Sequence, residues 1–195
     1  MKLHSCLLCG VGGQGTVLAS RIIATAAINR GCFARTAETI GMAQRGGCVT
    51  SHVRIGTKVP SPLIPRGCAD SMLAFEPGEA VRNLPFLKKN GSLIVCDRAV
   101  HPVTAALADT KYSAEAMLDY LKANVENCLV LHVDDILALT GSVKAVNMAL
   151  VGAMAQTGTM ELTYADVEHA MTHRIKPAFL EMNRKALKYG AECVK

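Results

Sequence analysis

The chain has 195 residues, of which 50% are hydrophobic and 19% are charged, and this composition is typical of a folded globular protein. The net charge is only +5, and the longest basic run is Lys88-Lys89. Proteins that bind nucleic acid usually carry a clustered basic face with stacking aromatic residues, whereas this chain lacks Trp and is only 4% aromatic. Composition therefore argues against a nucleic-acid partner.

The eight cysteines are scattered at positions 6, 9, 32, 48, 68, 96, 128 and 193. Several lie inside apolar runs, where a free cysteine behaves as a small buried hydrophobic residue. The apolar run that starts at Leu3 is too short for a secretory signal, and no stretch reaches the length of a membrane span. We therefore expect a reduced, soluble, cytoplasmic protein without a membrane partner.

Short apolar runs bounded by turn residues predict strands. In chain order they are residues 3–9, 32–36, 48–55, 71–75, 92–96 and 128–133. Segments of helical composition lie between them: residues 16–29, followed by Gly31 as a C-terminal glycine, then a helix that Pro77 opens and that ends before Pro85, then residues 114–123.

From residue 143 on, the sequence predicts only helices, at 143–156, 164–171 and 177–189, with Thr163 as an N-cap. Strands that alternate with helices predict an α/β fold with a mainly parallel sheet and helices on both faces, in a Rossmann-like three-layer arrangement. We expect a single domain over residues 1–195, with the strand 3–9 central and a helical C-terminal part, 143–195, packed on the sheet.

The strongest chemical signal is Gly10-Val-Gly-Gly-Gln-Gly15, which follows the first strand and opens a helix, the position of the dinucleotide fingerprint G-x-G-x-x-G. Glycines allow a tight turn and close approach of an anion, and free N–H groups at a helix start attract phosphate. The candidate binding residues are Gly10, Gly12, Gly13, Gln14, Gly15 and Thr16. The glycines would serve equally well as a purely structural turn, and Glu38, the nearest acidic residue to the second strand's end, is poorly placed for a ribose.

A second signal is the connection from Thr36 to Gly47, because a long ordered connection usually carries function. Arg45, before Gly46 and Gly47, could hold a carboxylate or phosphate through two hydrogen bonds, or pair with a partner chain. In the next strand Thr50, His52 and Arg54 alternate with Val49, Val53 and Ile55, so they share one face and extend the same surface. An ordinary solvated face would look the same.

No catalytic or metal-binding set is evident in the sequence. Cys6 and Cys9 have C-x-x-C spacing, but on a strand they point to opposite faces. His169 and His173 share a helical face without the H-E-x-x-H pattern, and no cysteine run suits an iron–sulfur cluster. The methionines at 148, 154 and 160 are expected in the core. We therefore predict no catalytic residue and no metal ligand in this chain.

Several segments in this order resemble the gamma-domain family of 2-oxoacid:ferredoxin oxidoreductases, and most closely the beta subunits of its indolepyruvate-oxidising members. They are the glycine loop, Ala37-Glu-Thr-Ile-Gly-Met-Ala-Gln-Arg-Gly-Gly47, Ser51-His-Val-Arg-Ile-Gly56, Ser61-Pro-Leu-Ile-Pro65, Phe75-Glu-Pro77, Val146-Asn-Met-Ala-Leu-Val-Gly152 and Asn183-Arg-Lys-Ala-Leu-Lys-Tyr-Gly190. The resemblance covers essentially the whole chain. It adds Gln44, Arg45, Gly46 and Gly47 to the candidate site. The cysteines at 48, 68 and 96 depart from the family pattern without an assigned role.

The resemblance implies a non-catalytic subunit that works with a large catalytic subunit, and through the complex with ferredoxin. The complex would decarboxylate an aryl 2-oxoacid oxidatively and transfer the acyl group to coenzyme A. Thiamine diphosphate, Mg²⁺ and 4Fe-4S clusters would lie in the large subunit. No cofactor is expected to be tightly bound here, although coenzyme A could bind at the glycine loop. Self-association stays open.

Three other interpretations remain at this stage. The chain could be a pure interaction subunit whose glycine loop binds nothing. The chain could be the gamma subunit for another oxoacid, such as pyruvate, 2-oxoglutarate or ketoisovalerate. It could also be a stand-alone NAD-binding oxidoreductase, which the glycine loop favours and the missing catalytic set opposes.

Overall fold

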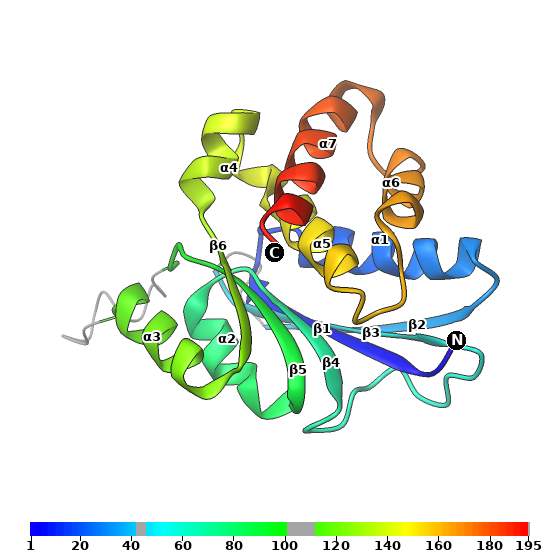
Figure 1. Cartoon of the computed structure of the whole chain (residues 1–195), viewed down its shortest axis with the longest axis horizontal. Helices are drawn as coiled ribbons and strands as arrows, with labels where there is room; N and C mark the ends of the chain where they lie inside the picture. Colours follow the sequence, from blue (N-terminus) through cyan, green and yellow to red (C-terminus); the bar gives the residue numbers. More distant parts are fainter. Residues whose placement is uncertain (42–45, 101–111, 195) are drawn as a thin grey trace.

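The computed structural model describes residues 1–41, 46–100 and 112–194, and within these ranges six strands form one sheet (Figure 1). Their order across the sheet is β2-β3-β1-β4-β5-β6. The strands are β1 (His4–Val11), β2 (Phe33–Ile40), β3 (Cys48–Gly56), β4 (Ala69–Ala74), β5 (Leu87–Cys96) and β6 (Asn127–Leu131).

Helices connect the strands and make up the C-terminal part. They are α1 (Thr16–Asn29), α2 (Pro77–Asn83), α3 (Ala114–Asn124), α4 (Val133–Thr140), α5 (Val146–Thr157), α6 (Tyr164–Thr172) and α7 (Pro177–Glu192), with the short 3-10 turns η1 (Leu84–Phe86) and η3 (Val143–Ala145). α1 has the predicted bounds, and Gly31 follows it with a φ of +75°. Thr163 caps α6 as predicted, in a capping box with Asp166.

The sheet is mixed but mostly parallel. β1 pairs in parallel with β4, β4 with β5 and β5 with β6, whereas β3 pairs antiparallel with both β1 and β2. The prediction of a mainly parallel sheet with the first strand in its interior is confirmed. Neither of the two antiparallel pairs was predicted. The pairing of β2 with β3 follows from their connection, because residues 41–47 are too few for the crossover that a parallel pair needs.

β2 is longer than the sequence predicted. Residues 37–40, which we assigned to the long connection, pair with β3 as far as Ile40 opposite Val49. β2 is an edge strand, and most of its side chains are exposed, among them Arg35 and Glu38. An exposed edge strand needs no apolar alternation, so its sequence resembles a loop.

The polar face of β3 is not the interaction surface that we predicted. Val53 and Ile55 lie in the core on one face, and His52 and Arg54 point to the other, as expected from the alternation. However, the segment after β3 covers them: Arg54 Nη1 donates to the carbonyl oxygens of Ser61 (3.0 Å) and Leu63 (3.1 Å). His52 and Arg54 are only 6% and 8% exposed, and burial lowers the pKa of His52.

Arg54 and His52 therefore hold the loop between β3 and β4 rather than a partner chain. His52 Nδ1 accepts a hydrogen bond from the Ile64 N–H at 3.2 Å, and Arg54 Nε donates to Ser5 Oγ at 3.3 Å. The alternation within a strand shows that these side chains share a face, but it does not show that the following loop folds back over them and takes up their hydrogen bonds.

The predicted C-terminal end of the last strand, 128–133, is wrong. β6 stops at Leu131, and Val133 is the first residue of α4. Asp134 and Asp135, which directly follow the predicted strand, lie in the first turn of α4. Negative charge is favourable there because the first N–H groups of a helix have no partners within it.

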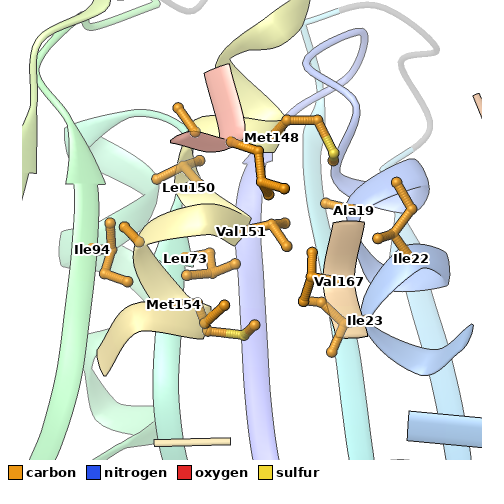
Figure 2. Packing of buried hydrophobic residues seen from close by; sticks show 14 of the residues in the cluster. Ala19, Ile22, Ile23, Leu73, Ile94, Met148, Leu150, Val151, Met154 and Val167 are labelled. Carbon is orange, nitrogen blue, oxygen red and sulfur yellow. The ribbon is translucent and has the colours of Figure 1, made fainter. Parts of the chain in front are cut away.

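Helices cover both faces of the sheet, as predicted. On one face α1 and α5 pack against the strands, and α6 and α7 pack on these two helices. Figure 2 shows side chains of α1 and α5 in this cluster, with Val167 of α6 between them. Met148, Met154 and Met160 are fully buried, which confirms them as core residues. On the other face α2 and α3 cover a second, smaller apolar cluster (Figure 1).

Cys6 and Cys9 point to these two opposite faces, as their spacing predicted. Cys6 belongs to the larger apolar cluster and Cys9 to the smaller one, and both are fully buried. Burial raises the pKa of Cys6 to about 12 and also raises that of Cys9. Both thiols are therefore protonated core residues.

α5 and α7 lie unusually close together. A Cβ atom at Gly152 would lie 2.0 Å from the carbonyl oxygen of Leu187, and one at Gly190 would lie 1.8 Å from that of Ala149. Backbone contacts this short leave no room for any side chain at either glycine. The two glycines thus set the spacing of the C-terminal helices on the sheet.

In the described part of the chain, no single helix has both the length and the apolar character to cross a membrane, although the bent pair Val133–Thr140 and Val143–Thr157 passes those two criteria together.

The topology creates a crevice between β1 and β4. After β1 the chain enters α1 on one face of the sheet, and after β4 it enters α2 on the other face. Connections that leave in opposite directions open a gap beyond the carboxyl ends of two parallel strands, where α/β proteins usually bind ligands. The glycine loop lies at this gap.

Candidate functional site

The glycine loop joins β1 directly to α1. Gly10 is still part of β1, Gly12 and Gly13 form the turn, and Thr16 begins the helix. Gly13 and Gly15 have φ angles of +102° and +89°, a region that favours glycine. Gly15 is the N-cap of α1 and makes no side-chain cap, so the first N–H groups of the helix stay free of a capping oxygen.

Gln14 holds the loop in shape through both ends of its amide. Its Oε1 accepts a hydrogen bond from the Val11 N–H at 2.8 Å, and its Nε2 donates to the Phe75 carbonyl at 3.2 Å. The second bond ties the end of β1 to the end of β4 across the crevice. Sequence analysis assigned Gln14 to ligand binding, whereas its two described hydrogen bonds are structural.

Gly10 and Gly15 are required by close neighbours. A Cβ at Gly10 would lie 2.6 Å from Gln14 Oε1 and 2.8 Å from Phe75 Cβ, and one at Gly15 would lie 2.7 Å from Asn147 Nδ2. Gly13 differs, because nothing lies within 4 Å of the position its Cβ would take. Gly13 therefore faces open space and is the glycine best placed to let a ligand approach the backbone.

The structure brings the two predicted segments together. The Gly12 N–H donates to the Gly47 carbonyl at 2.9 Å, and Gly46 adopts a φ of +75°. The end of the connection 36–47 thus lies against the glycine loop. Gln44 and Arg45 lie outside the described residues, so their predicted roles stay predictions.

A cavity of about 220 Å³ opens at the glycine loop. Gly13, Gln14 and Phe75 form one side, and Arg98 and Lys144 bring positive charge to its lining. Arg98 forms an ion pair with Asp134 at the start of α4. Thr16 is buried and is not part of the lining, so its hydroxyl is no more than a neighbour of the site.

This cavity suits a phosphate or carboxylate. In the described part of the chain, no hydrogen bond engages the N–H groups of Gly13, Gly15 or Thr16, which lie at the start of α1. Such groups, the helix dipole and two nearby cations all favour an anion. The cavity is too small for a whole nucleotide cofactor, so it would hold only part of one.

A second cavity, of about 250 Å³, lies on the other side of Gly46 and Gly47. Its wall contains two carboxylates, Glu76 and Glu79, which are 1% and 2% exposed. Glu76 caps α2 by accepting from the Glu79 N–H at 2.5 Å, and it also accepts from the Tyr112 hydroxyl at 2.9 Å. Sequence analysis missed both carboxylates.

Cys48 and Arg82, which are both exposed, complete the network around the buried Glu79. The Cys48 thiol donates to Glu79 Oε1 at 3.0 Å, and Arg82 Nε lies 3.1 Å from the same oxygen. The hydrogen bond to Glu79, with burial second, raises the pKa of Cys48. Burial, together with the hydrogen bond to Glu76, raises the pKa of Tyr112. In the sequence, the signal for Glu76 is that it directly precedes Pro77 at the start of a helix. Proline is favoured in the first turn of a helix, so the residue before it is the expected N-cap.

The NAD-binding interpretation loses its geometric basis. In a dinucleotide-binding fold the second strand lies next to the first, so that its acidic residue reaches the ribose. Here β3 separates β2 from β1, and Glu38 on β2 lies 3.4 Å from Ser20 Oγ in α1 instead. The described Cys, His, Asp and Glu side chains also form no group of three that could hold a metal ion.

Removing the Gln14 amide should destabilise the fold. In Gln14→Leu the Val11 N–H and the Phe75 carbonyl lose their partners, which costs about 1–3 kcal/mol. We expect a lower midpoint of urea unfolding with an unchanged slope. Gln156→Leu, on an exposed face of α5, is the matched control and should change little. Equal midpoints for the two variants would contradict the assigned role of Gln14.

Comparison with known proteins agrees with this architecture. The family model described as pyruvate ferredoxin/flavodoxin oxidoreductase matches residues 5–193. Indolepyruvate oxidoreductase subunit IorB of Archaeoglobus fulgidus is 41% identical over 182 residues, which are 93% of this chain and 90% of that protein.

Two solved structures share the fold. The gamma subunit of a keto/oxoacid ferredoxin oxidoreductase from Geobacter sulfurreducens is 25% identical, covers 97% of both chains and superposes with a TM-score of 0.69. The 2-oxoglutarate:ferredoxin oxidoreductase of Magnetococcus marinus, solved with 2-oxoglutarate, coenzyme A and succinyl-CoA, is 16% identical with a TM-score of 0.71. There this chain is matched over its whole length by 32% of the longer chain. By sequence and fold, the chain belongs to the pyruvate ferredoxin/flavodoxin oxidoreductase family, as a member of its indolepyruvate oxidoreductase small-subunit group.

Proposed function

We propose that this chain is the small, non-catalytic subunit of an indolepyruvate:ferredoxin oxidoreductase. The whole enzyme decarboxylates an aryl 2-oxoacid, transfers the acyl group to coenzyme A and reduces ferredoxin. The observation that carries the proposal is the 41% identity to an indolepyruvate oxidoreductase subunit over nearly the full length of both chains. We further propose that residues 1–195 act as one domain in the cytoplasm.

The side chains at the crevice support a non-catalytic role. Cys48 and Tyr112 have raised pKa values, so both are protonated at neutral pH and are poor nucleophiles or bases. Glu76 and Glu79 are engaged in the α2 cap and the network with Cys48 and Arg82. These groups stabilise the loops around the glycine turn rather than face a reacting atom.

Thiamine diphosphate, Mg²⁺ and 4Fe-4S clusters are assigned to the large partner subunit. A cluster needs several cysteines gathered at one place, whereas Cys6 and Cys9 are buried on opposite faces of the sheet. No described cysteine belongs to a group of three potential ligands. Ferredoxin would then meet the complex through the large subunit, which holds the clusters.

Coenzyme A is the ligand that we assign to the glycine loop. Its diphosphate would accept hydrogen bonds from the N–H groups of Gly13, Gly15 and Thr16, with Arg98 and Lys144 adding charge. The cavity of about 220 Å³ holds only that part, so the rest of the molecule would extend along the crevice. When bound, coenzyme A supplies the thiol that accepts the acyl group. The Gly47 carbonyl accepts the hydrogen bond from the Gly12 N–H, and through this bond Gly46 and Gly47 would position the glycine loop.

Reconstitution tests the proposal. The chain and its large subunit are purified separately, and indolepyruvate-dependent reduction of an electron acceptor is followed with coenzyme A present. Turnover should appear only in the mixture, because neither the thiamine nor the clusters are assigned to this chain. Pyruvate, 2-oxoglutarate and ketoisovalerate serve as alternative substrates.

Three outcomes would contradict parts of the proposal. Turnover by the chain alone would overturn its non-catalytic role. A mixture that prefers one of the other oxoacids would assign the chain to that enzyme instead. Calorimetry on the isolated chain with NAD and with coenzyme A separates the remaining alternative, since tight NAD binding would favour a dinucleotide-dependent oxidoreductase.

A further inference from the structure

A second groove, of about 520 Å³, lies beside α7 and adjoins the cavity at the glycine loop. The first turn of α1, η3, the start of α5 and the start of α7 form its walls. We call it the α7 groove and define it by Leu18, Lys144, Asn147, Lys176, Phe179 and Met182. Only Lys144 also lines the cavity at the glycine loop.

The α7 groove is positively charged. Lys144, Arg174 and Lys176 line it, and no carboxylate does. Arg174 Nε donates to Thr25 Oγ1 at 3.1 Å, and none of the three cations forms an ion pair within the described residues. Three unpaired cations around one groove attract a negatively charged occupant.

The floor of the groove is apolar and open to solvent. Leu18, Ile175 and Met182 contribute to it, and Phe179 is 52% exposed at its edge. Val143, 51% exposed, lies on η3 next to Lys144. Exposed aromatic and aliphatic side chains that share a groove with cations are typical of a protein interface with an apolar centre and a charged rim.

A buried amide in the groove lacks a partner. Asn147 is 3% exposed, and its Oδ1 has no hydrogen-bond donor within the part of the chain that the structure describes. A buried acceptor without a donor is unfavourable, so such groups in folded proteins normally find one. Because this oxygen is closed off from solvent, the amide belongs to the wall of the groove and is not offered to an occupant.

We propose that the α7 groove docks a segment of the large partner subunit that carries carboxylates beside an apolar side chain. Such a segment matches both features of the surface: carboxylates pair with Lys144 and Lys176, and an apolar side chain packs on Phe179. The proposal rests on the function proposed above, which supplies the partner.

The solved structures agree with a fold that associates with additional protein. This fold makes up 97% of one solved chain and only 32% of another, so it occurs both alone and joined to a longer chain. Where the fold is a separate subunit, no peptide bond joins it to the rest of the enzyme. It then needs a docking surface instead. The α7 groove offers an apolar centre together with charge, a combination that gives both affinity and orientation.

The test compares two charge- and size-matched double variants in binding to the purified large subunit. Lys176→Glu with Phe179→Asp alters the groove at two exposed side chains. Lys122→Glu with Phe33→Asp makes the same chemical changes on α3 and on β2, outside the groove. We expect the dissociation constant to rise roughly 100-fold for the groove variant and by less than about twofold for the control.

Two further measurements separate docking from folding. Thermal unfolding of the isolated chains should show that both double variants stay folded, because all four side chains are exposed. For the wild type, the association rate should fall as salt is raised, since cations steer the encounter.

The outcomes are distinct. If the wild-type chain does not bind the large subunit, the proposed function is wrong and the docking proposal fails with it. If the wild type binds and the groove variant binds equally well, or the control loses more affinity, the docking proposal alone is overturned. It is also overturned if the groove variant only converts a dimer of this chain into monomers, because the groove would then serve self-association.

Discussion

Gly152→Ala is expected to destabilise the protein by about 4 kcal/mol or more, although the same change in an ordinary helix stabilises by about 1 kcal/mol. The reason is the contact with α7: the added methyl group would lie 2.0 Å from the Leu187 carbonyl oxygen. Because the obstacle is backbone rather than a flexible side chain, the two helices must move apart and lose packing along their length. Urea unfolding followed by circular dichroism measures the loss.

Gly158→Ala is the control for this prediction. Gly158 ends α5 with a φ of +69° and has nothing within 4 Å of its Cβ position, so only local strain of about 1 kcal/mol is expected. The double variant Gly152→Ala with Gly190→Ala should lose less than the sum of the single variants, since one separation of α5 from α7 relieves both clashes. A Gly152→Ala variant as stable as the wild type would contradict the close helix packing.

The sequence predicts well those parts of the fold whose ends are marked by local signals, such as glycines at the ends of a helix. α1 runs between Gly15 and Gly31, both at positive φ, and its predicted and observed bounds coincide. β1 is a continuous apolar run that is buried on both faces, and its central place follows from that composition. Such features need no knowledge of the rest of the chain.

The sequence predictions are wrong where pairing with another segment of the chain decides the structure. β2 is a polar edge strand that exists because β3 pairs with it, and residues 37–40 carry no strand pattern of their own. His52 and Arg54 look like an exposed polar face, but the loop between β3 and β4 folds over them. In each case the contact that decides the structure comes from another segment of the chain.

The candidate site shows the same division. The glycine loop and Gly46-Gly47 are visible in the sequence, but their contact through the Gly12 N–H and the Gly47 carbonyl is not. Glu76 and Glu79 look like ordinary residues at a helix start, and their burial depends on Cys48 and Tyr112, which lie far away in the chain. The chain topology brings the members of such polar networks together, so a single sequence rarely predicts them.

Gly13→Val in the assembled enzyme is expected to raise the KM for coenzyme A roughly 10- to 100-fold. Nothing lies within 4 Å of the Cβ position of Gly13, and Gly13 lines the cavity at the start of α1. A side chain there would occupy the space through which a phosphate reaches the N–H groups of the loop. We assign binding of the oxoacid to the large subunit in the proposed function, so the KM for indolepyruvate should change little.

Gly31→Val separates this effect from backbone strain. Gly31 also has a positive φ, +75°, and also has nothing within 4 Å of its Cβ position, but it lies at the opposite end of α1. Both variants should lose about 1–3 kcal/mol of stability, because valine is strained in this region of φ. Only Gly13→Val should then alter the KM for coenzyme A. If the two variants give the same KM, the loss of affinity comes from strain alone, and the glycine loop is a structural turn that binds no phosphate.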